Sequence, residues 1–176
     1  MNDQMIDDEL AIVDERTGPP GGPVIDRHTI RQPIRVLNPR APLVTPPDAS
    51  VRTAVQMMRD HRIGCVLVVD GARLVGILTE RDLLLKLDDA DLSMPVSDLM
   101  TPDPETLCAD DPISYVLNRM SEGGYRHVPL VDGDGRPTGI VSVRDVVHYL
   151  ADSFPLTVFT VPPAPRTAAW RWRYGA

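Results

Sequence analysis

One short motif that occurs twice carries the residue types best suited to bind an anionic ligand. It reads GILTERDLL at residues 76–84 and GIVSVRDVV at residues 139–147. In each copy a Thr or Ser stands where a helix would begin, and an Asp follows three residues later. A helix start has free backbone N–H groups and a partial positive charge, which favour an anion such as phosphate. The hydroxyl can donate to that phosphate, and the Asp can accept hydrogen bonds from the two hydroxyls of a ribose.

The same motif has a simpler interpretation as a capping box, in which a Ser or Thr at the N-cap is followed by an acid three residues later. For a single copy this is the more frequent meaning, since short motifs often match by accident. Two copies inside a longer repeat favour ligand binding. The repeated elements around each copy therefore decide between the two interpretations.

The two motif copies lie in two repeated units. When 62 is subtracted from the numbers of the second unit, Leu99 falls on Leu37 and Asp132 falls on Asp70. One extra residue in the Gly-rich turn at 133–136 makes the offset 63 afterwards, so that the two motif copies coincide. A turn of this kind tolerates an insertion, which supports the alignment.

Each unit predicts the element order β-α-β-β-α, an α+β arrangement. The predicted elements are an extended segment (43–45; 105–107), an amphipathic helix (51–58; 113–120), a buried strand (65–69; 128–131), an Asp-Gly turn (70–71; 132–133), a strand that enters the motif, and a second helix (81–87; 144–151). A unit of this size is marginally stable alone, so we expect the two units to pair and bury their sheet faces.

The composition limits the classes of protein to which the chain can belong. Its 176 residues are 43% hydrophobic, enough to build a core, and contain no run of 18 apolar residues that would predict a membrane span. The net charge of −7 argues against a general nucleic-acid binder. No secretory signal is visible, so we expect a cytoplasmic protein in which Cys65 and Cys108 are buried free thiols.

No residue pattern predicts catalysis. The sequence has neither a Gly-x-x-x-x-Gly-Lys phosphate loop nor a nucleophile elbow. Its four histidines lack the spacing of metal ligands. We therefore expect no enzymatic activity, no catalytic residue, no metal site and no cofactor.

Two flanking segments fall outside the repeat. Residues 1–35 combine an acidic arm, which is either a docking helix or a frayed end, with a Gly/Pro linker. Ile30, Ile34 and Val36 are compatible with a short strand, although Pro33 weakens that interpretation. Residues 153–176 are predicted to form an extended tail that ends in alternating aromatic and Arg residues.

The ordered set of motifs resembles a tandem CBS domain pair, also called a Bateman module. The resemblance rests on DLMTP at residues 98–102, on Val-Val-Asp-Gly, and on the two copies of the opening motif, and it covers about residues 36–152. It implies two β-α-β-β-α CBS units, at 36–91 and 92–152, packed as a pseudo-two-fold pair in a stand-alone bacterial CBS domain-containing protein. The second unit matches better, since residues 38–40 read Asn-Pro-Arg where the family usually shows Met-Thr-Pro.

CBS pairs typically bind adenosine derivatives in clefts between the two units, and the resemblance carries the binding residues over to this sequence. Ribose would be bound by Asp82 and Asp145. Phosphate would be bound by Thr79, Ser142, Arg126, His127, Arg81 and Arg144, and adenine by Val44, Thr45, Thr106 and Leu107.

The two clefts are not expected to be equal. The first unit has uncharged residues at 64–65, where the second has Arg126 and His127. The cleft that these two residues reach is therefore predicted to hold phosphate more tightly, because charge-assisted hydrogen bonds are the stronger ones. Two alternatives stay open: a solvated turn for Arg126 and His127, and ion pairs at a dimer surface for Arg81 and Arg144.

The resemblance implies a regulatory function. An adenine nucleotide of the AMP, ADP or ATP type, or a ligand of the S-adenosylmethionine type, would change the arrangement of the units or of a homodimer. The change would signal to an unknown effector protein. Two other functions stay open: a scaffold or redox-linked interaction protein that has lost ligand affinity, and a nucleic-acid-associated regulator that uses the Arg/Trp tail.

Overall fold

The computed structural model of the chain describes residues 27–86 and 91–153. The predicted acidic arm, the first part of the linker and nearly all of the C-terminal tail lie outside these residues. The elements in order are α1 (Arg27–Arg31), η1 (Ile34–Leu37), β1 (Val44–Thr45), α2 (Val51–His61), β2 (Cys65–Asp70), β3 (Arg73–Thr79), α3 (Glu80–Lys86), α4 (Val96–Leu99), β4 (Thr101–Pro102), α5 (Ile113–Glu122), β5 (His127–Val131), β6 (Pro137–Ser142) and α6 (Val143–Ser153). Within the described ranges, no helix is both long and apolar enough to cross a membrane.

The α+β arrangement is confirmed, and the two units have separate sheets. A four-stranded sheet has the order β1-β2-β3-β4, in which β1 runs parallel to β2 and the other neighbours are antiparallel. In the second unit β5 and β6 form a two-stranded antiparallel sheet, where a single parallel bridge between Leu107 and Leu130 takes the place of β1. The hairpin between β2 and β3 turns at Gly71, whose φ of 61° favours glycine.

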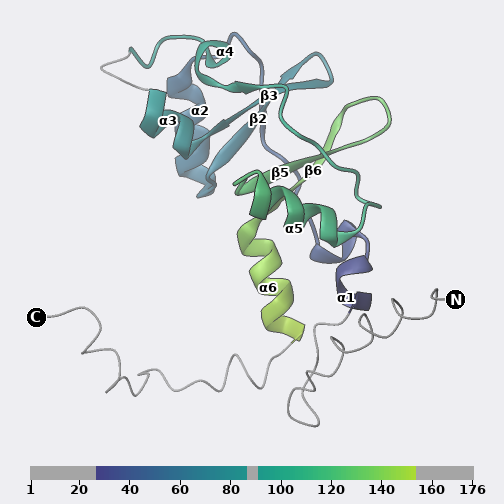
Figure 1. Ribbon diagram of the computed structural model, residues 1–176. Helices are drawn as coiled ribbons and strands as arrows, with labels where there is room; N and C mark the ends of the chain where they lie inside the picture. The colour runs from purple at the N-terminus through teal and green to yellow at the C-terminus, as the bar shows by residue number, and fades with distance from the viewer. Residues whose placement is uncertain (1–26, 87–90, 154–176) are drawn as a thin grey trace, which may run out of the picture.

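Helices cover the outer side of each sheet, and the sheets face each other in the middle of the molecule (Figure 1). Successive residues of β2 point into different cores. Val66 packs with α2 in the core of the first unit, whereas Leu67 belongs to a central cluster that is covered by Ile140 of β6. Because side chains alternate along a strand, both faces of β2 are buried and its first four residues are all inaccessible.

Each unit completes its core with a segment that precedes the other unit. Ile34 of η1 belongs to the core of the second unit, and Val96 of α4 belongs to the core of the first. Both side chains are fully buried. The backbone follows the same exchange, since β4 pairs with β3 and the amide N–H of Ile140 in β6 donates to the carbonyl of Arg40. The core of each unit therefore depends on a segment that lies next to the other unit in the sequence.

The glycine that begins each motif makes room for these exchanged segments. A Cβ atom on Gly76 would lie 2.2 Å from Sδ of Met100, and one on Gly139 would lie 3.2 Å from Cβ of Pro39. Both distances are below ordinary van der Waals contact. The absence of a side chain on this glycine therefore permits close packing in both copies.

Two local interpretations are corrected by the structure. Residues 30–36 form no strand, because α1 ends at Arg31 and η1 begins at Ile34 with Pro33 as its N-cap. Proline has no amide hydrogen for a strand ladder and suits a position before a helix. Cys108 is exposed rather than buried, because Leu107 turns inward and alternation directs the next side chain outward.

Candidate functional site

Two clefts open between the units, and each contains one copy of the repeated motif. The Asp145 cleft has a volume of about 330 Å³ and is lined by Asp145, Ser142 and Arg144 of the second unit together with residues of the first. The Asp82 cleft has a volume of about 420 Å³ and contains Asp82 and Thr79. Small-molecule sites start at about 300 Å³, so either cleft could hold a compact ligand.

Both motifs form the capping box that a simple structural interpretation predicts. Oδ2 of Asp82 accepts hydrogen bonds from the amide N–H of Thr79 (3.0 Å) and from its hydroxyl (2.6 Å). Oδ2 of Asp145 accepts the same two bonds from Ser142, at 2.7 Å each. This cap uses only one carboxylate oxygen. Capping and ligand binding are therefore compatible, and the surroundings of Oδ1 decide whether each Asp can also bind a ligand.

The second oxygen of Asp82 is already occupied. Oδ1 accepts a hydrogen bond from the hydroxyl of Thr101 (2.9 Å) and lies 2.7 Å from Nζ of Lys86. Lys86 also donates to the carbonyl oxygens of Leu99 and Met100, so its three protons have three acceptors. Burial alone would raise the pKa of Asp82, but hydrogen bonds, first among them that from Lys86, lower it below the ordinary value. Asp82 is thus an ionised carboxylate with both oxygen atoms bonded.

The corresponding oxygen of Asp145 is free of hydrogen bonds to the described residues. The nearest cationic atom to this Oδ1 is Nη2 of Arg40 at 3.9 Å, which is beyond hydrogen-bond distance. The positions that match Thr101 and Lys86 hold Pro39, whose side chain has no donor, and Tyr149, which has no ammonium group. The Oδ1 atom of Asp145 can therefore accept hydrogen bonds from a ligand.

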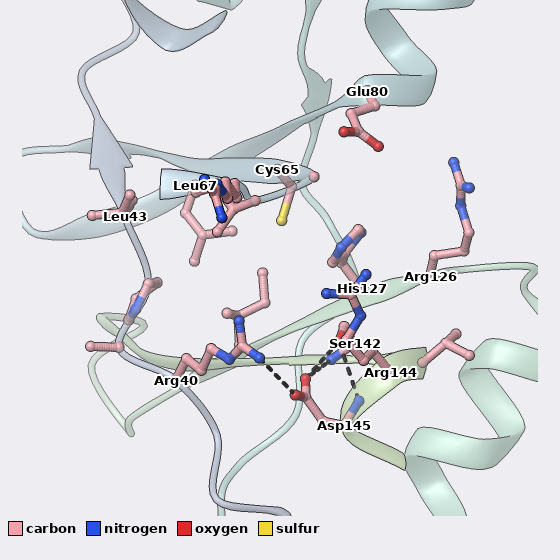
Figure 2. Close-up of a pocket in the computed structure, with 17 residues that line it drawn as sticks. Arg40, Leu43, Cys65, Leu67, Glu80, Arg126, His127, Ser142, Arg144 and Asp145 are labelled. Atoms are coloured by element: carbon pink, nitrogen blue, oxygen red, sulfur yellow. Dashed lines mark hydrogen bonds and ion pairs between the residues drawn. The ribbon is translucent and has the colours of Figure 1, made fainter. Parts of the chain in front are cut away.

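Figure 2 shows how the Asp145 cleft is built from both units. Ser142 and Asp145 lie on the side of the second unit, where their hydrogen bonds are drawn. Cys65 and Leu67 lie opposite them, on β2 of the first unit. The wall formed by β2 is apolar, whereas the opposite side carries hydroxyl and carboxylate groups.

The two clefts differ in charge. Four arginines line the Asp145 cleft against the two carboxylates of Glu80 and Asp145; the arginines are Arg40, Arg62, Arg126 and Arg144. Two arginines, Arg81 and Arg126, line the Asp82 cleft against three carboxylates, those of Asp82, Asp103 and Glu105. Two of these three are bound elsewhere, since Asp82 pairs with Lys86 and Glu105 pairs with Arg119. The Asp145 cleft has the larger excess of positive charge, which favours a phosphate-bearing ligand.

Arg126 and His127 line both clefts. The imidazole of His127 lies against Gly64, where a Cβ would approach Cε1 to 3.2 Å. Burial lowers the pKa of His127, and the neighbouring Arg126 lowers it further, against the opposite effect of Glu80 and Asp145. The unequal affinity expected from Arg126 and His127 therefore cannot come from these two residues alone, because both clefts share them.

The residues expected to hold adenine line neither cleft. The Asp145 cleft is lined instead by residues 40–43, which precede Val44 and Thr45, and the Asp82 cleft by residues 101–105, which precede Thr106 and Leu107. Thr45 and Leu107 are turned into the body of the protein and are 3% and 8% exposed.

Other residues of the clefts carried no signal in the sequence. Arg40, Arg62 and Thr101 stand near the motifs only in the folded chain, as a result of the exchanged segments and of the end of α2. The remaining predicted residues, Thr79 and Arg81 in one cleft and Ser142 and Arg144 in the other, lie together with their motif Asp.

The side chains of the Asp145 cleft are suited to binding a ligand. Burial, aided by the charge of Glu80, raises the pKa of the Cys65 thiol to about 12, so it carries no thiolate at neutral pH. Within the described residues, no group of three or more His, Cys, Asp or Glu side chains could hold a metal ion. The arrangement of hydroxyl, carboxylate and guanidinium groups suits recognition of a sugar phosphate.

The sequence was compared with protein families and with curated proteins. The model of the CBS domain family matches residues 36–89 and 96–152. An uncharacterized 17.7 kDa protein of Acidianus ambivalens is 34% identical over 110 residues, which cover 62% of this chain and 67% of that protein. The CBS domain-containing protein CBSCBSPB3 of Arabidopsis thaliana is 34% identical over 114 residues, which cover 63% of this chain and only 20% of the plant protein.

Solved structures show the same fold with ligands. A CBS domain protein of Pyrobaculum aerophilum complexed with AMP has a TM-score of 0.63 and 25% identity, covering 73% of this chain and 99% of that one. The CBS domain pair of protein MJ0100, in complex with 5′-methylthioadenosine and S-adenosyl-L-methionine, has a TM-score of 0.63 and 26% identity. This match covers 69% of our chain and 97% of the other.

Proposed function

The chain belongs to the CBS domain family, and we propose that it is a regulatory module whose Asp145 cleft binds an adenosine ligand that carries phosphate. The observation that carries the proposal is the free Oδ1 atom of Asp145 in a cleft with an excess of arginine. The complexes of related CBS proteins with AMP and with S-adenosyl-L-methionine support an adenosine ligand.

Each side of the cleft has a role in this proposal. Asp145 accepts hydrogen bonds from the ribose hydroxyls through Oδ1 while Oδ2 caps α6. Arg144 and Arg126 bind the phosphate, because guanidinium groups donate strongly to phosphate oxygens, whereas Ser142 already donates its hydroxyl proton to Asp145. The adenine lies against the apolar wall formed by Leu43 and Leu67.

The position of the cleft suggests how binding could regulate. A ligand held by residues of both units has a higher affinity for the arrangement in which they close around it, so binding shifts the population towards that arrangement. Exposed apolar side chains on the outer helices, among them Leu84 and Leu85 of α3 and Val147 of α6, fit a homodimer interface. We propose that a homodimer transmits the change to an effector protein.

Isothermal titration of the full chain with AMP, ADP, ATP and S-adenosylmethionine tests the proposal. We expect AMP to bind, and we expect Asp145→Asn to weaken binding at least about tenfold, since a hydrogen bond to a charged group contributes roughly 1.5–3 kcal/mol. Asp82→Asn is the matched control, because this Asp is already bonded, and it should leave the affinity of the Asp145 cleft unchanged. If none of the four compounds binds, or if only Asp82→Asn weakens binding, the proposal is wrong.

A further inference from the structure

Arg62 has an unusual backbone conformation at the end of α2. As the C-cap of this helix, it adopts φ of 53° and ψ of 46°, in the left-handed region. Side chains with a Cβ atom are disfavoured there, and glycine most often takes this position at the end of a helix. A positive φ in a residue other than glycine costs free energy, and residues with such strain are enriched at functional sites.

The repeat provides an internal comparison. Position 62 of the first unit corresponds to Gly124 of the second, which adopts φ of 65° after the end of α5. Gly124 lines the Asp82 cleft and Arg62 lines the Asp145 cleft, so the two positions are equivalent in space as well as in sequence. The second unit thus meets the same backbone requirement with glycine and without strain. The fold itself does not require arginine at this position.

Arg62 brings a positive charge to the end of α2, close to position 64, where the first unit has a glycine. Gly64 stands where the second unit has Arg126, and its place cannot easily hold a side chain. A Cβ there would lie 3.2 Å from Cε1 of His127 and 3.3 Å from Oε2 of Glu80. Arg62, two residues earlier, is exposed and lines the cleft without that obstruction.

We propose that Arg62 is a specificity-determining residue, which binds the phosphate of the ligand in the Asp145 cleft from the side of the first unit. This inference rests on the proposed function, since it assumes a phosphate-bearing ligand in that cleft. Ser142 and Arg144 approach the same cleft from the second unit. A phosphate between Arg62 and Arg144 would add a charge-assisted connection between the two units, which an adenosine derivative without phosphate would lack.

Three variants of the full chain separate the charge of Arg62 from its backbone strain. Arg62→Gly removes both, Arg62→Gln removes only the charge, and Arg62→Lys keeps a charge on a strained backbone. We expect Arg62→Gly and Arg62→Gln to weaken AMP binding about tenfold, as for the loss of one charge-assisted hydrogen bond, and Arg62→Lys to weaken it less. The Tm of the ligand-free protein should rise by about 2 °C in Arg62→Gly alone, because only glycine relieves the strain.

Asn38→Gly is the matched control. Asn38 also has a positive φ, of 52°, but it is exposed and lines neither cleft, so its replacement should not change AMP affinity. Equal AMP affinity of Arg62→Gly and wild type would overturn the role of Arg62 while leaving the proposed function intact, provided that Asp145→Asn still weakens binding. A fall of the Tm in Arg62→Gly would overturn the argument from strain. Absence of AMP binding to the wild type would overturn both proposals.

Discussion

Replacing Lys86 with methionine should open the Asp82 cleft to a second ligand. The ammonium of Lys86 bonds Oδ1 of Asp82 and two main-chain carbonyls, whereas methionine has a similar length and no donor. After the change, Oδ1 would keep only the hydrogen bond from Thr101. The hydroxyls of a ribose could then donate to Asp82 as we propose for Asp145.

The size of the effect follows from the exposure of Lys86. A hydrogen bond to a charged group contributes about 1.5–3 kcal/mol, but the Lys86 side chain is 41% exposed and water screens the pair. We therefore expect Lys86→Met to reduce stability by about 1 kcal/mol, which lowers the Tm of a chain of this length by about 2–4 °C. A ligand that replaces the lost interaction regains about the same free energy, so the affinity of the Asp82 cleft should rise about fivefold or more.

Isothermal titration with AMP measures the number of sites directly. We expect one site in the wild type, two in Lys86→Met, and one in Lys86→Arg, which keeps the positive charge beside Asp82. In the double variant Lys86→Met, Asp145→Asn, the remaining strong site should be the Asp82 cleft. Two equivalent sites in the wild type would refute the reasoning, as would a single site in a Lys86→Met variant whose Tm has fallen as expected.

Two further predictions concern the fold. Gly76→Ala should lower stability by about 1–3 kcal/mol, because the new Cβ would lie 2.2 Å from Sδ of Met100 and overpack the site. Thermal unfolding measures this loss, and Gly133→Ala, where no atom lies within 4 Å, should cause little change. Asp82→Asn should reduce the pH dependence of stability below about pH 4. Since the folded pKa of Asp82 lies below its ordinary value, its contribution is present above pH 4 and is lost as the pH falls through the lowered pKa. Urea unfolding at pH 3, 5 and 7 measures the free energy of unfolding. This free energy should decrease less between pH 5 and pH 3 in the variant than in the wild type. An equal decrease in both proteins would contradict the assignment.

The order of helices and strands follows from local patterns that can be recognised in the sequence. The apolar stripes starting at Val51 and Ile113 mark α2 and α5, which begin at these residues. The buried runs mark β2 and β5, and the two motif copies mark the strands and helices that follow them. Alternation and helical periodicity depend only on neighbours within a few residues. These elements could therefore be predicted without knowledge of the tertiary contacts.

The inequality of the two motif aspartates could not be predicted in the same way. Lys86 is four residues from Asp82 and would suggest an ordinary helix pair. Its additional bonds to Leu99 and Met100, and the bond from Thr101 to Asp82, exist only because α4 and β4 cross to the first unit. Sequence spacing gives no information about such an exchange.

The exchange also determines which residues line the clefts. The resemblance to CBS pairs implies that residues of the extended segments, among them Thr45 and Leu107, contact adenine. Because the segments cross earlier, residues 40–43 reach the motif of the second unit and residues 101–105 reach the motif of the first. Of the residues that follow, Thr45 and Leu107 are buried in the protein.

The same exchange determines how a ligand can act on the whole molecule. Arg40 bonds to β6 through its backbone and approaches Asp145 through its side chain, although it lies at the beginning of the first unit in the sequence. Ile34, a few residues earlier, is buried in the core of the second unit. A ligand that draws Arg40 towards Asp145 therefore acts on a segment that connects both cores. Under the proposed function, binding can act on the second core without a separate hinge, because Arg40 of the cleft and Ile34 of that core lie on one short stretch of chain.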